Sequence, residues 1–106
     1  MTPQILLVLT TLATPEQARA LGRAVVERRL AACAQVQAIE SVYRWQGALH
    51  QEPEWRLLLK TTAARYPALQ AALRAEHPYE LPAIVALPCH DALPEFAAWV
   101  AAETAD

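Results

Sequence analysis

The sequence predicts a single α+β domain spanning residues 1–106, with elements in the order β-α-β-β-α-β followed by a short helix. Three observations predict it. Alternating or continuous apolar runs mark four strands, segments headed by proline mark three helices, and 106 residues with 55% hydrophobic content suffice for one core. The right-handedness of crossovers then places both main helices on one face of an antiparallel sheet.

The first strand is expected over residues 4–12, where the apolar run is nearly continuous, as in a central strand. Thr14-Pro15-Glu16-Gln17 is typical of a helix start, with threonine as the N-cap and proline in the first turn. An apolar stripe at helical spacing predicts that this helix ends near residues 30–32. Gly22 lies on the stripe, where it either lets the helix approach the sheet closely or weakens it.

A long hairpin is expected next. Alternation over residues 33–45 predicts a second strand, Gln46-Gly47 predicts a tight turn, and a third strand returns from residue 48 to residue 60. The apolar phase switches near Ala38-Ile39, which indicates either a bulge or a strand whose far part is buried in a neighbouring subunit. Pro53 predicts a bulge or an edge position in the third strand.

The remaining elements complete the fold. A second helix begins at Tyr66-Pro67 and stops at His77-Pro78, because a residue before proline avoids the helical region. A fourth strand is expected over residues 83–87, and Pro94 opens a last helix whose expected apolar face is Phe96, Trp99 and Val100. The central hairpin and this element order predict a ferredoxin-like sandwich with one sheet face left uncovered.

Charge and targeting signals narrow the function. Acidic residues outnumber basic ones, 11 to 9, so the net charge of −2 disfavours nucleic acid as a partner. No apolar stretch approaches the length of a membrane span, and the amino-terminal run lacks the basic region of a signal peptide. We therefore expect a cytoplasmic protein with no membrane partner, in which Cys33 and Cys89 stay reduced.

Four short segments stand out together: Arg29-Leu30-Ala31-Ala32-Cys33, Ser41-Val42-Tyr43-Arg44-Trp45-Gln46-Gly47, Leu57-Leu58-Leu59-Lys60-Thr61 and His77-Pro78-Tyr79-Glu80-Leu81-Pro82. In this order and at these separations they resemble the CutA family of divalent-cation tolerance proteins. The resemblance covers roughly residues 5–99. It implies a ferredoxin-like homotrimer, similar in build to PII signalling proteins, in which the hairpin pairs across subunits and closes the trimer.

The same resemblance implies a role in the response to metal ions, with copper binding and no firmly attached enzymatic reaction. Surplus apolar residues also favour self-association, and aromatic side chains on the hairpin are more often interface anchors than ligand platforms. The expected trimer-interface residues are therefore Tyr43, Trp45 and Trp55.

Metal binding is the sharpest functional hypothesis, and the expected ion is Cu(II) or another divalent metal. Copper prefers imidazole and thiolate ligands. The metal residues that the resemblance implies fall on Thr10 or a neighbour, where the family has cysteine, and on Glu76-His77, where it has a histidine pair. The candidate ligands are His77, Glu76 and Cys33. The alternatives are a His77 that hydrogen-bonds near the helix end and a Cys33 packed in the core.

A second hypothesis is a PII-like signalling or scaffold trimer that binds a small anion or a partner protein in clefts between subunits. Arg44 and Lys60 are the candidate anion ligands, and Tyr79 and Glu80 either belong to this cleft or lock their loop against a neighbouring subunit. A glycine-rich phosphate loop is missing, because the chain has only two glycines.

No motif predicts an enzyme. The sequence contains no G-x-S-x-G and no H-E-x-x-H. Glu52, Glu54 and Glu80 are interpreted as single acids, without the spacing of a catalytic carboxylate pair. Residues 89–91 place cysteine, histidine and aspartate side by side, but neighbouring side chains on a strand diverge, so an exposed loop is expected there.

Overall fold

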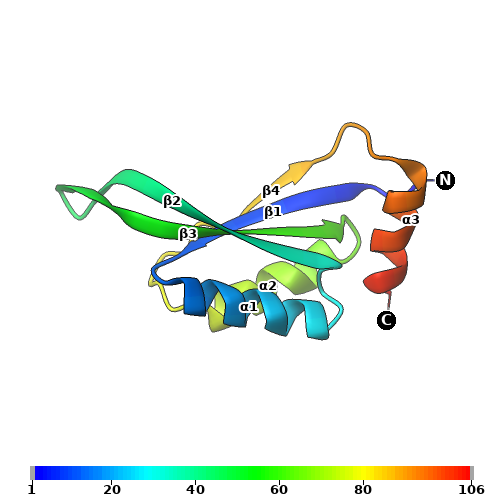
Figure 1. Ribbon diagram of the computed structural model, residues 1–106, viewed down its shortest axis with the longest axis horizontal. Helices are drawn as coiled ribbons and strands as arrows, with labels where there is room; N and C mark the ends of the chain where they lie inside the picture. Colours follow the sequence, from blue (N-terminus) through cyan, green and yellow to red (C-terminus); the bar gives the residue numbers. More distant parts are fainter. Residues whose placement is uncertain (1, 106) are drawn as a thin grey trace.

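The computed structural model describes residues 2–105 and confirms the α+β class. One antiparallel sheet has the order β2-β3-β1-β4. Two helices, α1 and α2, cover the same face of this sheet, and α3 lies at one end (Figure 1). The element bounds are β1 Ile5–Leu12, α1 Pro15–Glu27, β2 Cys33–Trp45, β3 Ala48–Thr62, α2 Tyr66–Glu76, β4 Val85–Pro88 and α3 Pro94–Glu103.

The core lies between the sheet and the two main helices. Its fully buried side chains include Val8, Leu57 and Leu59 from the central strands and Val25 and Leu69 from the helices. Burying large aliphatic side chains in this way contributes about 1.5–3 kcal/mol each. Strands β1 and β3, at the centre of the sheet, therefore supply the sheet side of the core.

Helix α1 begins where the sequence predicts. The Thr14 hydroxyl accepts the Gln17 backbone N–H at 3.1 Å, as an N-cap does. A Cβ added to Gly22 would lie 2.9 Å from the Leu57 Cδ1 atom and 3.0 Å from the Ala34 Cβ atom. Of the two interpretations of Gly22, the close approach of helix to sheet is therefore the correct one.

The end of α1 differs from the prediction, since the helix stops at Glu27 rather than near residues 30–32. Arg29 has a positive φ of 59°, which turns the chain out of the helix. The backbone N–H groups of Arg29 and Leu30 then donate to the carbonyls of Val26 and Val25. This Schellman-type ending satisfies the last helical carbonyls without a glycine.

The hairpin of β2 and β3 has the predicted tight turn, with positive φ angles of 49° and 80° at Gln46 and Gly47. Its register is continuous from Cys33 opposite Lys60 to the turn, so the bulge is the wrong alternative both at residues 38–39 and at Pro53. β1 ends opposite Trp55, so the far part of the hairpin projects as two strands alone (Figure 1). Pro53 lies in that part, where β3 pairs only with β2 and its other edge is free. Proline has no backbone N–H, so it is tolerated at such an edge.

The sheet face away from α1 and α2 is open and partly apolar. Val85 and Leu87 of β4 are 49% and 46% exposed there.

The predicted apolar face of α3 is wrong in part, because Phe96 and Trp99 are exposed and the small residue Ala97 is buried with Val100. A small side chain lets α3 sit tightly against the start of β1. No helix in the part of the chain that the structure describes is long and apolar enough to cross a membrane.

Candidate functional site: an acidic cleft beside the hairpin

A cleft of about 930 Å³ lies where the projecting hairpin meets the end of β1 and the segment between α2 and β4. The hairpin forms one wall and the residues that follow the His77-Pro78 stop form another. The lining residues are Thr11, Ala13, Glu40, Ser41, Val42, Tyr43, Trp45, Glu52, Pro53, Glu54, Tyr79, Glu80, Leu81 and Ala83.

The charge of the cleft is one-sided. Four glutamates, Glu40, Glu52, Glu54 and Glu80, are among its lining residues, and no lysine, arginine or histidine stands among the described lining residues. Clefts with low-dielectric walls and one sign of charge concentrate the field of that charge. This arrangement favours cations over anions as ligands.

Glu54 and Tyr79 form the best buried polar contact of the cleft. The Tyr79 hydroxyl donates to the Glu54 carboxylate at 2.7 Å, and Glu54 is only 8% exposed. Burial, and next the hydrogen bond to Glu54, raise the pKa of the Tyr79 phenol. Tyr79 therefore stays protonated and satisfies a carboxylate that has little access to water.

A second tyrosine–glutamate pair lies further out on the hairpin. The Tyr43 hydroxyl donates to Glu52, and this hydrogen bond is the main reason why the pKa of Tyr43 is raised to about 12. The Tyr43 ring stacks on His50 of the opposite strand, with centroids 5.1 Å apart. Both phenols of the cleft are thus hydrogen-bond donors to carboxylates rather than nucleophiles at neutral pH.

His77 lies behind the cleft wall and has partners on both ring nitrogens. Its Nδ1 accepts the Tyr79 backbone N–H at 3.1 Å. Its Nε2 lies 3.0 Å from the Thr11 carbonyl oxygen and 3.0 Å from the Thr10 hydroxyl. Burial lowers the pKa of His77 below the ordinary 6.5, although the Thr11 carbonyl and the charge of Glu54 act in the opposite direction.

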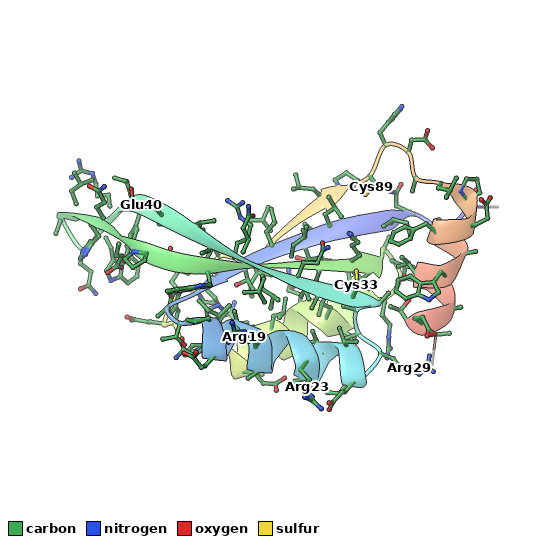
Figure 2. All side chains as sticks on the ribbon, viewed as in Figure 1. Arg19, Arg23, Arg29, Cys33, Glu40 and Cys89 are labelled. Carbon is green, nitrogen blue, oxygen red and sulfur yellow. The ribbon has the colours of Figure 1, made fainter. Side chains whose placement is uncertain are left out.

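The structure does not bring the three candidate metal ligands together. Glu76 pairs with Arg28 at 2.7 Å on the helical side of the molecule. Cys33 is the first residue of β2 and lies near α3, whereas Glu40 of the same strand lies toward the hairpin turn (Figure 2). Within residues 2–105 no group of three or more histidine, cysteine, aspartate or glutamate side chains is placed to hold a metal ion. The donors of one chain therefore do not fit a copper site.

The candidate anion ligands are likewise separated. Lys60 donates to Gln35 at 3.3 Å and lies 5.6 Å from the Phe96 ring centre, at the α3 end of the sheet. Neither Lys60 nor Arg44 lines the cleft, whereas Tyr79 and Glu80 do. An anion site built from the four residues together is not formed within one chain.

The predicted interface aromatics occupy two environments. Tyr43 and Trp45 line the cleft on the hairpin. Trp55 packs against the core under α1 and α2, because it shares the side of β3 that carries Leu57. A substitution at Trp55 would therefore disturb the fold of the subunit itself.

The sequence interpretation missed Glu40, Glu52 and Glu54 as cleft residues. Glu52 and Glu54 are two positions apart on one strand, and Glu40 pairs with Pro53 between them. Period-2 spacing along β3 is the signal that could have united Glu52 and Glu54 on one face, whereas the pairing with Pro53 turns the Glu40 side chain to the other face of the ribbon.

Known proteins match this chain over most of its length. The family model described as CutA1 divalent ion tolerance protein matches residues 6–103. The divalent-cation tolerance protein CutA of Thermus thermophilus is 43% identical over 98 residues, which cover 92% of this chain and 95% of that protein. The protein of the same name from Thermotoga maritima is 38% identical over 96 residues, covering 91% and 95%.

Solved structures agree with the sequence matches. CutA from Synechococcus elongatus superimposes with a TM-score of 0.93 at 38% identity, covering 98% of this chain and 93% of that one. A structure from Archaeoglobus fulgidus, described as a periplasmic divalent cation tolerance protein CutA, gives a TM-score of 0.92 at 26% identity, covering 95% and 99%. The matched segments include the hairpin, the His-Pro-Tyr segment and the cleft between them. The chain described here belongs to the CutA1 divalent ion tolerance protein family.

Proposed function

We propose that this protein acts in divalent-cation tolerance as a non-enzymatic homotrimer, in which the cleft of one subunit lies against the hairpin of the next. The observation that carries the proposal is the projecting half of the hairpin, which pairs with no third strand in the part of the chain that the structure describes. A two-stranded ribbon exposed on both faces is marginally stable by itself in water. A second subunit would supply the missing contacts.

The exposed apolar side chains support this assembly. Val42 and Leu49 on the hairpin are 60% and 69% exposed. The open sheet face adds Val85 and Leu87, and β2 and β4 are free sheet edges. Exposed apolar patches and unpaired edges are the features that subunit interfaces cover. Tyr43 and Trp45 would then become interface residues through the cleft, as their sequence positions predict.

We further propose that the cation, Cu(II) or another divalent ion, is taken up at the subunit boundary rather than within one chain. The family name and the one-sided charge of the cleft support this proposal. Glu80 and Glu52 would be the carboxylates of this chain that face the ion, because Glu54 is buried against Tyr79 and Glu40 lies on the other face of the ribbon. Glu52 is exposed, and its second carboxylate oxygen is available beside the one that accepts from Tyr43. Oxygen donors of this kind suit hard cations better than Cu(I).

The alternative of a PII-like trimer that holds a small anion is disfavoured by the same cleft. Cationic side chains are strong donors to phosphate and carboxylate ligands, and the described lining provides four glutamates instead. A scaffold that binds a basic segment of a partner protein would fit this charge.

Native mass spectrometry of tag-free protein tests the assembly. We expect a trimer for the wild type and a monomer for Leu87→Glu, because the substitution places a charge on the open face without touching the core of the subunit. Ala71→Glu on the exposed side of α2 is the matched control and should stay trimeric. A wild-type monomer, or a trimeric Leu87→Glu protein, would show that this face does not join subunits.

The same measurement with equimolar Cu(II), Zn(II) or Mn(II) tests the cation. We expect a fixed metal count per trimer that falls in the double variant Glu52→Gln, Glu80→Gln and persists in Cys33→Ser. Loss of metal in Cys33→Ser alone, or scattered adducts with no fixed count, would contradict uptake by the carboxylates of the cleft.

A further inference from the structure

We infer that His77 is a structural clamp and not a metal ligand: a neutral imidazole with both nitrogens engaged fastens the His-Pro-Tyr segment to β1 and thereby holds the wall of the cleft in place. The inference concerns one subunit. It stands whether or not the proposed trimer and the proposed cation uptake are correct.

The hydrogen bonds of His77 fix its protonation. A backbone N–H can only donate, so the Nδ1 atom that receives the Tyr79 N–H at 3.1 Å must be unprotonated. A carbonyl oxygen can only accept, so the Nε2 atom 3.0 Å from the Thr11 oxygen must carry the proton. Only the neutral imidazole with its proton on Nε2 satisfies both contacts.

This arrangement leaves no lone pair for a metal. Histidine binds copper or zinc through an unprotonated ring nitrogen. The Nδ1 lone pair points at the Tyr79 N–H, and His77 as a whole is only 8% exposed. A metal at Nδ1 would have to displace the backbone of Tyr79, and a metal at Nε2 would have to displace the contacts to β1.

Thr10 and Cys33 do not complete a ligand set around His77, and residues 2–105 hold no group of three or more metal-binding side chains. The resemblance places a cysteine at Thr10 or a neighbour, and the Thr10 hydroxyl lies 3.0 Å from Nε2 and is part of the clamp. Cys33 aligns through Lys60 with Leu7, three positions along β1 from Thr10, so its side chain faces the opposite side of the sheet. Cys33 also lies two strands away from Thr10, and the two residues are about 10 Å apart along the strand direction.

The clamp has a positive role in shaping the cleft. His77 follows the last residue of α2, and its contacts tie that end to the end of β1. Tyr79 is thereby directed across to β3, where its hydroxyl meets Glu54 at 2.7 Å. The rings of His77 and Tyr79 lie 4.9 Å apart and support each other. One histidine thus sets the position of two cleft residues.

Nuclear magnetic resonance of the wild-type protein, with ¹⁵N-labelled histidine, tests the inference directly. Long-range ¹H–¹⁵N spectra should show the His77 ring as neutral with the proton on Nε2, and addition of equimolar Zn(II) should leave both ring nitrogens unshifted. Protonation on Nδ1, or a stoichiometric shift of a His77 nitrogen with Zn(II), would overturn the inference.

A binding and exchange measurement complements the spectra. His77→Gln should change the Cu(II) dissociation constant by less than about twofold. It should raise the hydrogen-exchange rate of the Tyr79 amide, which loses its acceptor. His90→Gln, at an exposed histidine of the β4–α3 loop, is the control and should leave that amide protected. A Tyr79 amide that exchanges equally fast in wild type and His77→Gln would contradict the clamp.

Discussion

Individual residues of the cleft wall combine burial with charge. Glu54 is the clearest case, because a carboxylate with 8% exposure needs a hydrogen-bond donor and receives one from Tyr79. Tyr43 and Glu52 form the same pair of residue types, but both lie on the hairpin and are exposed. The two pairs thus allow the effect of burial to be measured with the chemistry held constant.

Tyr79→Phe is expected to lower the free energy of unfolding by about 1–3 kcal/mol, because it leaves the Glu54 carboxylate buried without its donor. Tyr43→Phe, the matched control, should cost no more than about 0.5 kcal/mol, since water replaces the lost donor at the exposed Glu52. Urea unfolding at one fixed protein concentration measures both. Equal losses would mean that Glu54 is hydrated after all.

His77 also predicts a pH dependence of stability. Burial holds its folded-state pKa below 6.5, so the unfolded chain binds the proton more readily. The contribution of neutral His77 to the free energy of unfolding is fully present above pH 6.5. It is lost as the pH falls from there through the folded-state pKa. Wild type should therefore lose more stability than His77→Gln between about pH 7.5 and 5.5. If wild type and His77→Gln lose the same free energy of unfolding in urea, the pKa of His77 is the same in the folded and the unfolded chain.

At the scale of elements, signals that act within a few residues predicted the structure well. The Thr14 cap and the Gln46-Gly47 turn formed as expected, because each depends on its own backbone. The end of α1 was placed too late, since Arg29 adopts a left-handed conformation that glycine usually supplies. The guanidinium of Arg29 donates to the carbonyls of Ala102 and Glu103, so a contact distant in sequence accompanies this conformation.

The contact of α1 with the sheet gives a prediction at this scale. Gly22→Ala should destabilise the protein by about 1–3 kcal/mol, because the new methyl group meets the fully buried Leu57 and overpacks the core. This loss opposes the gain of up to about 1 kcal/mol from better helix propensity. Ala20→Gly on the exposed side of α1 calibrates that propensity term. A more stable Gly22→Ala protein would mean that the helix can move away from β3.

The whole molecule shows why part of the site was out of reach of the sequence. Tyr79 and Glu54 are 25 residues apart, and their contact depends on how the segment after α2 is held between β1 and β3. The apolar phase switch near Ala38-Ile39 suggested a bulge, yet the strand is regular, because beyond β1 the hairpin has no core of its own to set the phase. Of the two explanations, burial in a neighbouring subunit stays a prediction.

Removal of the projecting half of the hairpin separates fold from assembly. A variant in which an Asn-Gly turn joins Glu40 directly to Pro53 should keep a cooperative unfolding transition, because no residue of the two core clusters lies in the deleted segment. It should no longer form a trimer in native mass spectrometry. An unfolded variant would mean that the ribbon stabilises its own subunit, and a trimeric one would exclude the hairpin from the interface.

The continuity of the hairpin has a consequence for synthesis in the cell. Its two strands are adjacent in sequence, whereas β4 and α3 come last and complete the edge of β1. A ribosome adds residues more slowly than a hairpin forms. The nascent chain therefore displays its ribbon before β1 has received β4.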